Sequence, residues 1–274
     1  MTDLLAAPPA TESAAGRLSR AARRRILDAG GRPLFVCDWD RVVFIHYSVP
    51  PEALRPLVPF EPDLFDGRAW VSAVSFTLRD LRPHGAGPGL KRLFAPVARQ
   101  RYLNVRTYVR HGGEAGIFFL REWMDHRMST WFVPPVYGLP YRHGRLDYDH
   151  RHESGRLAGR VRGGPAAPGE WRYRAAVAPD AGYRPVVPGS LDEFLLERYV
   201  AFTERRGVRR HFRVWHVPWP QIPVEAEILD DRLLAATGPW TSRARFAGAN
   251  YSPGMKEVWM GRPRMCTETA TSDH

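Results

Sequence analysis

The stretch that most constrains the fold is residues 102–123, which reads YLNVRTYVRHGGEAGIFFLREW. Two runs rich in Val, Tyr, Thr, Ile and Phe flank His111-Gly112-Gly113-Glu114. Paired glycines supply the positive φ angles that a tight hairpin turn requires, so the stretch predicts a β-hairpin. A hairpin this apolar is expected to lie centrally in its sheet.

Alternation of side chains along the first strand places Asn104, Arg106 and Tyr108 on one sheltered face. A buried arginine without a partner costs several kcal/mol, so Arg106 is expected to face a carboxylate, a carbonyl or a bound anion. Either a structural partner within the protein or a bound ligand would satisfy Arg106. The same alternation on the second strand predicts that Glu122 shares a face with Phe118, Leu120 and Met124, opposite Ile117, Phe119, Arg121 and Trp123.

Charge and cysteine content narrow the class of protein. The 274-residue chain has a formal net charge of +11, carried by arginine, and its only lysines are Lys91 and Lys256. Such a bias reflects genome composition as easily as an anionic partner. Cys37 and Cys266 lie far apart, which excludes a disulfide scaffold or a cysteine zinc site and fits a reducing compartment. With no apolar run of about 18 residues, we expect a cytoplasmic protein without a transmembrane segment.

The chain divides into four predicted regions. Residues 1–16 are expected to be disordered, residues 17–31 to form a basic helix, residues 32–265 to form a single β domain, and residues 266–274 to be a flexible tail. Leu18, Ala22 and Ile26 repeat at helical spacing, which predicts that the helix packs a thin apolar stripe on its own domain. The alternative is that its arginines bind acidic lipid or nucleic acid.

About ten strand-like runs and few helices follow one another without βαβ alternation. This order predicts a mainly β, β-rich α+β fold with an antiparallel sheet or barrel. Residues 82–100 hold glycines, prolines and basic residues and are expected to form a long loop of the binding or flap type. Ser190-Leu191-Asp192-Glu193 is a capping box, which predicts a helix from there to about Arg205. The last strands are expected at 242–251 and 257–260.

Nucleotide-binding, serine-hydrolase and zinc-protease motifs are absent from the sequence. His150 and His152 alternate beside Asp147 and Asp149, a pattern that two surface histidines explain better than a metal site. We therefore expect no metal and no cofactor.

Two other histidines are candidates for acid–base chemistry. His46 shares a strand face with Phe44, and a hydrogen-bonded core histidine is favoured there over a catalytic one. His216 ends a strand close to Trp219, and either a pocket wall or a rigid corner would explain that pair.

Several motifs together resemble the YqjF-like bacterial family, a domain of unknown function in the acetoacetate-decarboxylase-like superfamily. They span residues 38–260 in order and include Phe44-Ile45-His46-Tyr47, Asn104-Val105-Arg106-Thr107-Tyr108-Val109, Glu197-Arg198-Tyr199 and His216-Val217-Pro218-Trp219. The resemblance implies a decarboxylase-like β-barrel with a central cavity.

The resemblance also implies that one reaction has been lost. Decarboxylases of this superfamily use a buried lysine, which follows a proline at the start of a strand and forms a Schiff base. The matching stretch here is Pro140-Tyr141-Arg142, and a tyrosine cannot form an imine. Asn104 stands where those enzymes carry a glutamate.

The leading hypothesis is a barrel whose cavity binds a small anionic or carbonyl-bearing molecule. The alternatives are a decarboxylase or lyase of the acetoacetate decarboxylase type and a non-enzymatic ligand sensor or carrier. If the protein is an enzyme, we expect a lyase, isomerase or hydratase without a Schiff base, with His46, Tyr141 and His216 as catalytic candidates. The expected ligand-binding residues are Asn104, Arg106, Tyr108, Glu122, Arg198, Tyr199 and Trp219. No specific nucleic-acid partner is expected, and a homo-oligomer is left open.

Overall fold

The computed structural model describes residues 13–28 and 32–267. Its strands are β1 (Phe35–Val49), β2 (Glu61–Pro62), β3 (Ala69–Pro83), β4 (Gln100–His111), β5 (Glu114–Met124), β6 (Tyr141–Arg151), β7 (Arg156–Gly163), β8 (Glu170–Ala176), β9 (Val200–Arg205), β10 (Val208–Trp215), β11 (Ile222–Asp230), β12 (Arg245–Met260) and β13 (Arg264–Met265). The α-helices are α1 (Ala14–Asp28), α2 (Pro88–Phe94), α3 (Ser129–Tyr137) and α4 (Leu191–Leu196), and short 3-10 turns lie between them.

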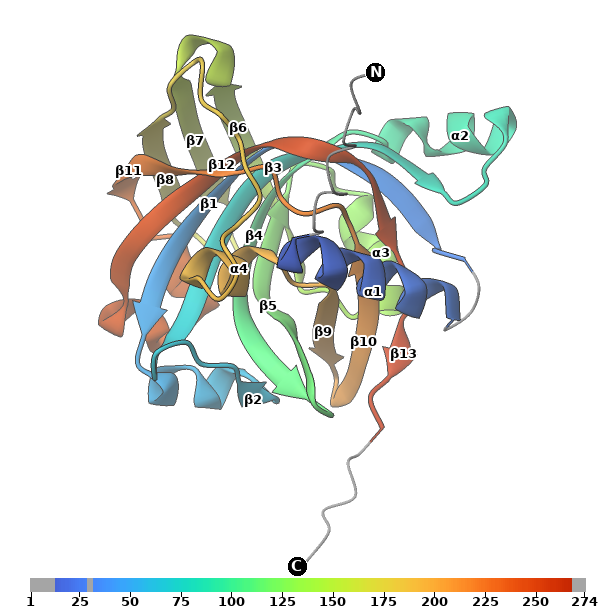
Figure 1. Ribbon diagram of the computed structural model, residues 1–274, viewed down its shortest axis with the longest axis horizontal. Helices are drawn as coiled ribbons and strands as arrows, with labels where there is room; N and C mark the ends of the chain where they lie inside the picture. Colours follow the sequence, from blue (N-terminus) through green and yellow to red (C-terminus); the bar gives the residue numbers. More distant parts are fainter. Residues whose placement is uncertain (1–12, 29–31, 268–274) are drawn as a thin grey trace, which may run out of the picture.

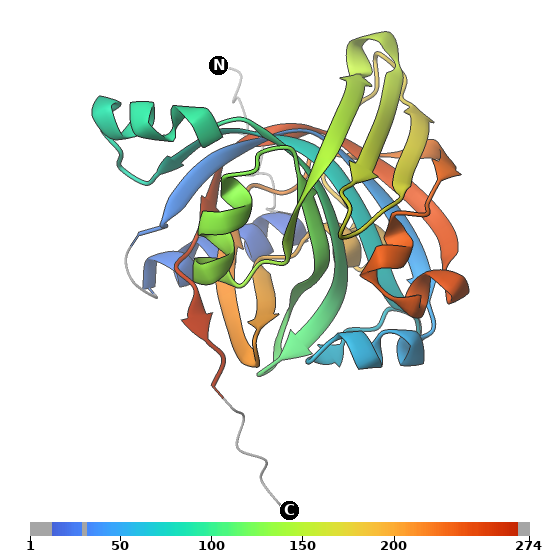
Figure 2. The same ribbon diagram turned by 180° about the vertical axis from the view of Figure 1, so that it is seen from behind.

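The sheet closes on itself twice (Figures 1 and 2). Because β10 pairs with β12 and β5 pairs with both β4 and β9, a first ring runs through β1, β3, β4, β5, β9, β10 and β12. A second ring of nine strands shares β12, β1, β3, β4 and β5 and is completed by β6, β7, β8 and β11. Pairing is antiparallel except at β5–β6 and β5–β9, which makes the barrel mixed. The predicted mainly β, barrel-type fold is confirmed.

The strands shared by both rings have two buried faces, one toward each ring. On β3, Val71 and Ala73 face the nine-strand ring, whereas Val74 and Phe76 face the seven-strand ring. The nine-strand ring is filled by large side chains such as the fully buried Trp123 and Trp171. The long apolar runs of these strands follow from this arrangement.

The hairpin forms as predicted, but one of its faces is reassigned. Gly112 and Gly113 have φ angles of 57° and 79°, which the turn requires. Val105 pairs with Arg121 and the next residue, Arg106, pairs with Phe119, so Leu120 is an extra residue in a β-bulge. The extra residue reverses the alternation beyond it. Glu122 therefore lies on the same face as Ile117 and Phe119, not opposite them as predicted.

The helix expected to run to about Arg205 is shorter than predicted. The capping box is present, because Ser190 Oγ accepts a hydrogen bond from the Glu193 N–H, but α4 ends at Leu196. Residues 200–205 instead form β9, which pairs with β10 and in parallel with β5. Tertiary strand pairing outweighs helix propensity in this segment.

Helix α1 packs on β10 and begins earlier than predicted. It starts at Ala14, so residues 14–16 are helical rather than disordered, and it ends at Asp28. Its buried side chains are Ala15, Ser19, Ala22 and Ile26, whereas Leu18 is 46 % exposed. Ser19 Oγ hydrogen-bonds the carbonyl of His216. The helix therefore packs on its own domain, but through a different stripe. Residues 1–12, 29–31 and 268–274, which carry parts of the predicted disordered start, helix end and tail, lie outside the described residues.

Two further segments differ from the prediction. The loop expected at residues 82–100 contains helix α2, and the two strands expected at 242–251 and 257–260 are one strand, β12. Irregular register between β12 and β1, with positive φ at Gly248 and Gly254, explains why the sequence pattern is broken there.

Candidate functional site

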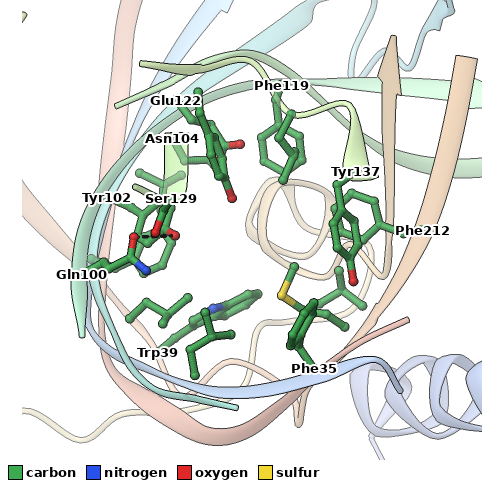
Figure 3. A pocket seen from close by; sticks show the side chains of 18 of the residues that line it. Phe35, Trp39, Gln100, Tyr102, Asn104, Phe119, Glu122, Ser129, Tyr137 and Phe212 are labelled. Atoms are coloured by element: carbon green, nitrogen blue, oxygen red, sulfur yellow. Dashed lines mark hydrogen bonds between the residues drawn. The ribbon is translucent and has the colours of Figure 1, made fainter. Parts of the chain in front are cut away.

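A cavity of about 640 Å³ occupies the seven-strand ring (Figure 3). Side chains from β1, β3, β4, β5, β9 and β10 line its wall, and Leu93, Met128 and Val136 from the segments around α2 and α3 lie at its mouth. The lining is predominantly apolar and aromatic, as in pockets for small organic molecules. The flap expected at residues 82–100 does contribute to it, through Leu93, Phe94 and Val97.

Asn104 and Glu122 form the polar centre of the wall. They are paired across β4 and β5, and Asn104 Nδ2 donates to Glu122 Oε1 at 3.3 Å. Asn104 Oδ1 and Glu122 Oε2 are buried and have no hydrogen-bond partner within the described chain. Burial raises the pKa of Glu122 to about 8, and Arg106 opposes that shift. At pH 7 the carboxyl group is thus mostly neutral and can donate a proton or a hydrogen bond.

Arg106 and Arg198 both line the cavity, but their bonding differs. Arg198 forms an ion pair with Asp63 at 2.7 Å and donates through Nε to the carbonyl of Phe194. Arg106 donates through Nη2 to the carbonyl of Leu195 at 3.1 Å, and its buried Nε has no partner within the described chain. Arg198 is therefore held as a structural pair, whereas Arg106 keeps donor capacity for a ligand.

Tyr141 is the residue that the sequence resemblance aligns with the decarboxylase lysine. It lies at the start of β6, in register with Glu122, and lines the cavity. Burial raises the pKa of Tyr141 well above its usual value, so the hydroxyl stays protonated. Lys91 and Lys256 are exposed and are not among the cavity-lining residues.

His216 and Trp219 both line the cavity, as the pocket-wall interpretation requires. Burial lowers the pKa of His216 to about 4, so the ring is neutral, and its Nδ1 donates to the carbonyl of Val217 at 2.7 Å. Tyr199 stacks on His216 with a centroid distance of 4.6 Å and donates to Glu197. Tyr199 does not line the cavity, and it acts on the site by holding the His216 ring in place. Trp219 stacks on Trp39 at 5.5 Å.

His46 and Tyr108 lie behind the wall and do not line the cavity. His46 contacts Ser72 Oγ through Nδ1 at 2.7 Å and Asn250 Oδ1 through Nε2 at 3.0 Å, and burial lowers its pKa to about 3. Ser72 in turn contacts the Tyr108 hydroxyl, which lies 3.0 Å from the Leu195 carbonyl that Arg106 also contacts. This buried chain supports Arg106 and leaves neither ring nitrogen of His46 free for a ligand.

Two polar residues of the lining, Gln100 and Ser129, are not among the site residues predicted from the sequence. Gln100 accepts a hydrogen bond from the Tyr102 hydroxyl at 3.4 Å (Figure 3). Gln100 begins β4 rather than ending the loop predicted for residues 82–100, and it continues the alternation of Tyr102 and Asn104, which is the sequence signal for its position in the lining. His150 is buried against Tyr173 rather than at the surface as expected. No cluster suited to a metal ion is found within the described residues.

The sequence profile of the DUF2071 family, described as an uncharacterized conserved protein, matches residues 37–256. The chain belongs to the DUF2071 family. One relative of this DUF2071 chain is the uncharacterized protein YqjF of Bacillus subtilis (strain 168), with 31 % identity over 204 residues, 73 % of this chain and 80 % of the relative. The YqjF-like resemblance is thereby confirmed.

Solved structures with the same fold include acetoacetate decarboxylase from Legionella pneumophila, with a TM-score of 0.58 and 12 % identity over 86 % of this DUF2071 chain and 88 % of the other. The enduracididine biosynthesis enzyme MppR complexed with pyruvate has a TM-score of 0.58 and 14 % identity over 86 % and 91 % of the two chains. At this identity the likeness establishes an acetoacetate-decarboxylase-like fold. None of the described helices is long and apolar enough to cross a bilayer.

The two faces of β3 offer a test of the cavity in solution. Val74→Phe adds volume where the DUF2071 barrel has open space and is expected to change the free energy of unfolding by less than about 1 kcal/mol. Val71→Phe, on the same strand, adds that volume to the filled ring and is expected to cost about 3 kcal/mol. Urea denaturation of both variants measures the difference. Equal losses would show that the cavity is not open space in solution.

Proposed function

We propose that this chain binds a small, largely apolar molecule with a carbonyl or carboxylate head, and that it does so without a covalent amine intermediate. The observation that carries the proposal is Arg106, which lines a predominantly apolar cavity and whose buried donor Nε has no partner within the described chain. A buried cation with spare donors favours an anionic or strongly polarised oxygen as its partner. The structural neighbour MppR is complexed with pyruvate, a molecule that carries both groups.

The residues around the head group supply hydrogen-bond donors. Arg106 is cationic, the Tyr141 hydroxyl is protonated, and neutral Glu122 holds a proton at pH 7. All three line the cavity, and a carbonyl oxygen that accepts hydrogen bonds from them would be polarised and stabilised as negative charge develops on it. The apolar wall would hold the rest of the molecule and exclude water, which strengthens each of these contacts.

If a reaction follows binding, we infer a proton transfer next to a carbonyl, as in a lyase, an isomerase or a hydratase. Glu122 would act as the acid, since its proton is retained up to about pH 8. Neutral His216 lines the same cavity, and because its Nδ1 donates to Val217, its Nε2 would be the atom that accepts a hydrogen bond or a proton. A sensor or carrier uses the same cavity and returns the molecule unchanged, so product analysis distinguishes it from an enzyme.

The Schiff-base alternative makes a different prediction. A lysine nucleophile needs a neutral amine at the substrate, and both lysines of the chain are exposed and outside the lining. Incubation with acetoacetate or acetopyruvate and borohydride is therefore expected to leave the protein mass unchanged. An adduct that Lys91→Met or Lys256→Met abolishes would replace this proposal with a decarboxylase of the acetoacetate decarboxylase type. An adduct retained in both variants would show nonspecific labelling.

A further inference from the structure

An exposed apolar surface surrounds the mouth of the cavity. We call it the rim surface and define it by Leu90, Leu93, Met128, Trp131 and Val136. Leu93 and Trp131 are each 73 % exposed, and Leu93, Met128 and Val136 also line the cavity. Apolar exposure is thus continuous from solvent into the pocket. Large exposed apolar side chains gathered at an opening indicate an interaction site rather than ordinary surface.

The two segments that carry the rim surface are basic. Residues 84–100 and 126–137 contain no aspartate or glutamate, and their cations are Lys91, Arg92, Arg99 and Arg127. All four are exposed, and none forms an ion pair with another described residue. Some exposed arginines elsewhere, such as Arg79, Arg174 and Arg243, are paired with carboxylates, whereas these four cations are available to an external anion.

We propose that the rim surface docks on an anionic phospholipid bilayer, so that the cavity opens toward the membrane. Leucine, methionine and tryptophan side chains enter the boundary between headgroups and acyl chains, and tryptophan favours that interface. The unpaired cations would contact the negatively charged headgroups beside them. The apolar residues match the acyl-chain boundary of such a bilayer, and the unpaired basic residues match its anionic headgroups.

Charge also favours a bilayer over a second copy of the chain. In a two-fold dimer through the rim surface, four cations of one copy would face the same four of the other, with no acidic residue in either segment to offset them. Like charges brought together across an interface oppose association. An anionic lipid surface removes that repulsion.

Docking of the rim surface on a bilayer narrows the class of ligand that can reach the cavity. This inference about the ligand rests on the proposed function. A cavity that opens into the headgroup region would take up a molecule dissolved in the membrane. That molecule would have an apolar body of a size suited to about 640 Å³ and the carbonyl or carboxylate head inferred above. Water-soluble acids of two to four carbons would leave most of the apolar wall without contacts.

Flotation of the full chain with vesicles of phosphatidylcholine and phosphatidylglycerol in a 70:30 ratio tests the docking without any ligand. Wild type is expected to float with these vesicles, at least about tenfold less with pure phosphatidylcholine, and progressively less as salt is added. Lys91→Glu with Arg92→Glu, and separately Leu90→Ser with Trp131→Ser, should each reduce binding at least about tenfold.

Matched substitutions elsewhere serve as controls. Arg24→Glu with Arg206→Glu changes charge equally away from the rim, and Val187→Ser removes an apolar side chain that is 70 % exposed. Both should bind vesicles as wild type does. No binding at low salt, equal binding to neutral vesicles, or an equal loss in the controls would overturn the proposal. So would a dimer, seen by light scattering, that Leu90→Ser with Trp131→Ser dissociates. Since no ligand is present, the outcome is independent of whether the cavity binds one.

Discussion

Replacing Glu122 by glutamine is expected to stabilise the protein, and more so as the pH rises. The folded pKa of about 8 lies above the unfolded value of 4.5, so wild type loses stability as the pH rises from 4.5 to about 8. In this window the unfolded chain releases a proton that the folded chain keeps. By that linkage, the stability lost relative to low pH is about 1 kcal/mol at pH 5 and about 3 kcal/mol at pH 7. Glutamine has no such proton.

The gap in unfolding free energy between Glu122→Gln and wild type should therefore widen by about 2 kcal/mol between pH 5 and pH 7. Urea denaturation at a series of pH values measures it. Glu225→Gln on the exposed side of β11 is the control and should run parallel to wild type over this range. Parallel curves for Glu122→Gln as well would mean that the carboxyl group is ionised in the folded protein, which removes it as an acid.

Leucine substitutions at Arg198 and Arg106 are expected to have opposite consequences. Arg198→Leu removes the guanidinium from buried Asp63, leaving it only Arg110 at 3.2 Å, and is expected to cost about 3 kcal/mol of unfolding free energy. Arg106→Leu separates no ion pair, and we expect it to change stability by about 1 kcal/mol or less while reducing ligand affinity by at least about a hundredfold. Thermal and urea unfolding compare the two variants directly.

The reverse pattern, with Arg106→Leu unfolding the protein and Arg198→Leu tolerated, would exchange the two roles. A protein stable in both variants but unchanged in binding would show that neither arginine contacts the head group.

Local sequence rules predicted the parts of the fold that depend on local chemistry. The paired glycines at 112 and 113 identified the hairpin, and alternation placed Asn104 and Arg106 on one sheltered face. Strands β1, β3, β4 and β5 are apolar along most of their length because each belongs to both rings and has both faces buried. The resemblance added the closed barrel, which pattern alone left open as a sheet or a barrel.

Features that depend on tertiary contacts were not predictable in the same way. The bulge at Leu120 has no glycine or proline to signal it, yet it brings Glu122 to the cavity. The start of α4 is encoded by Ser190 and Glu193, but its end at Leu196 follows from the pairing of β9 with β5 and β10. The sequence does not reveal which apolar face is filled and which is open, because both faces carry the same kinds of residue and the difference depends on how side chains of non-adjacent strands meet across each ring.

Native mass spectrometry of the wild-type chain titrated with 3-oxo carboxylates of six to twelve carbons tests the central claim most directly. The claim is that the cavity holds the head of such a molecule non-covalently at Arg106. A complex of one-to-one mass is expected, which dissociates on denaturation and is lost in Arg106→Leu although that variant remains folded. Absence of a complex with every member of the series, or complexes that persist unchanged in folded Arg106→Leu, would contradict it.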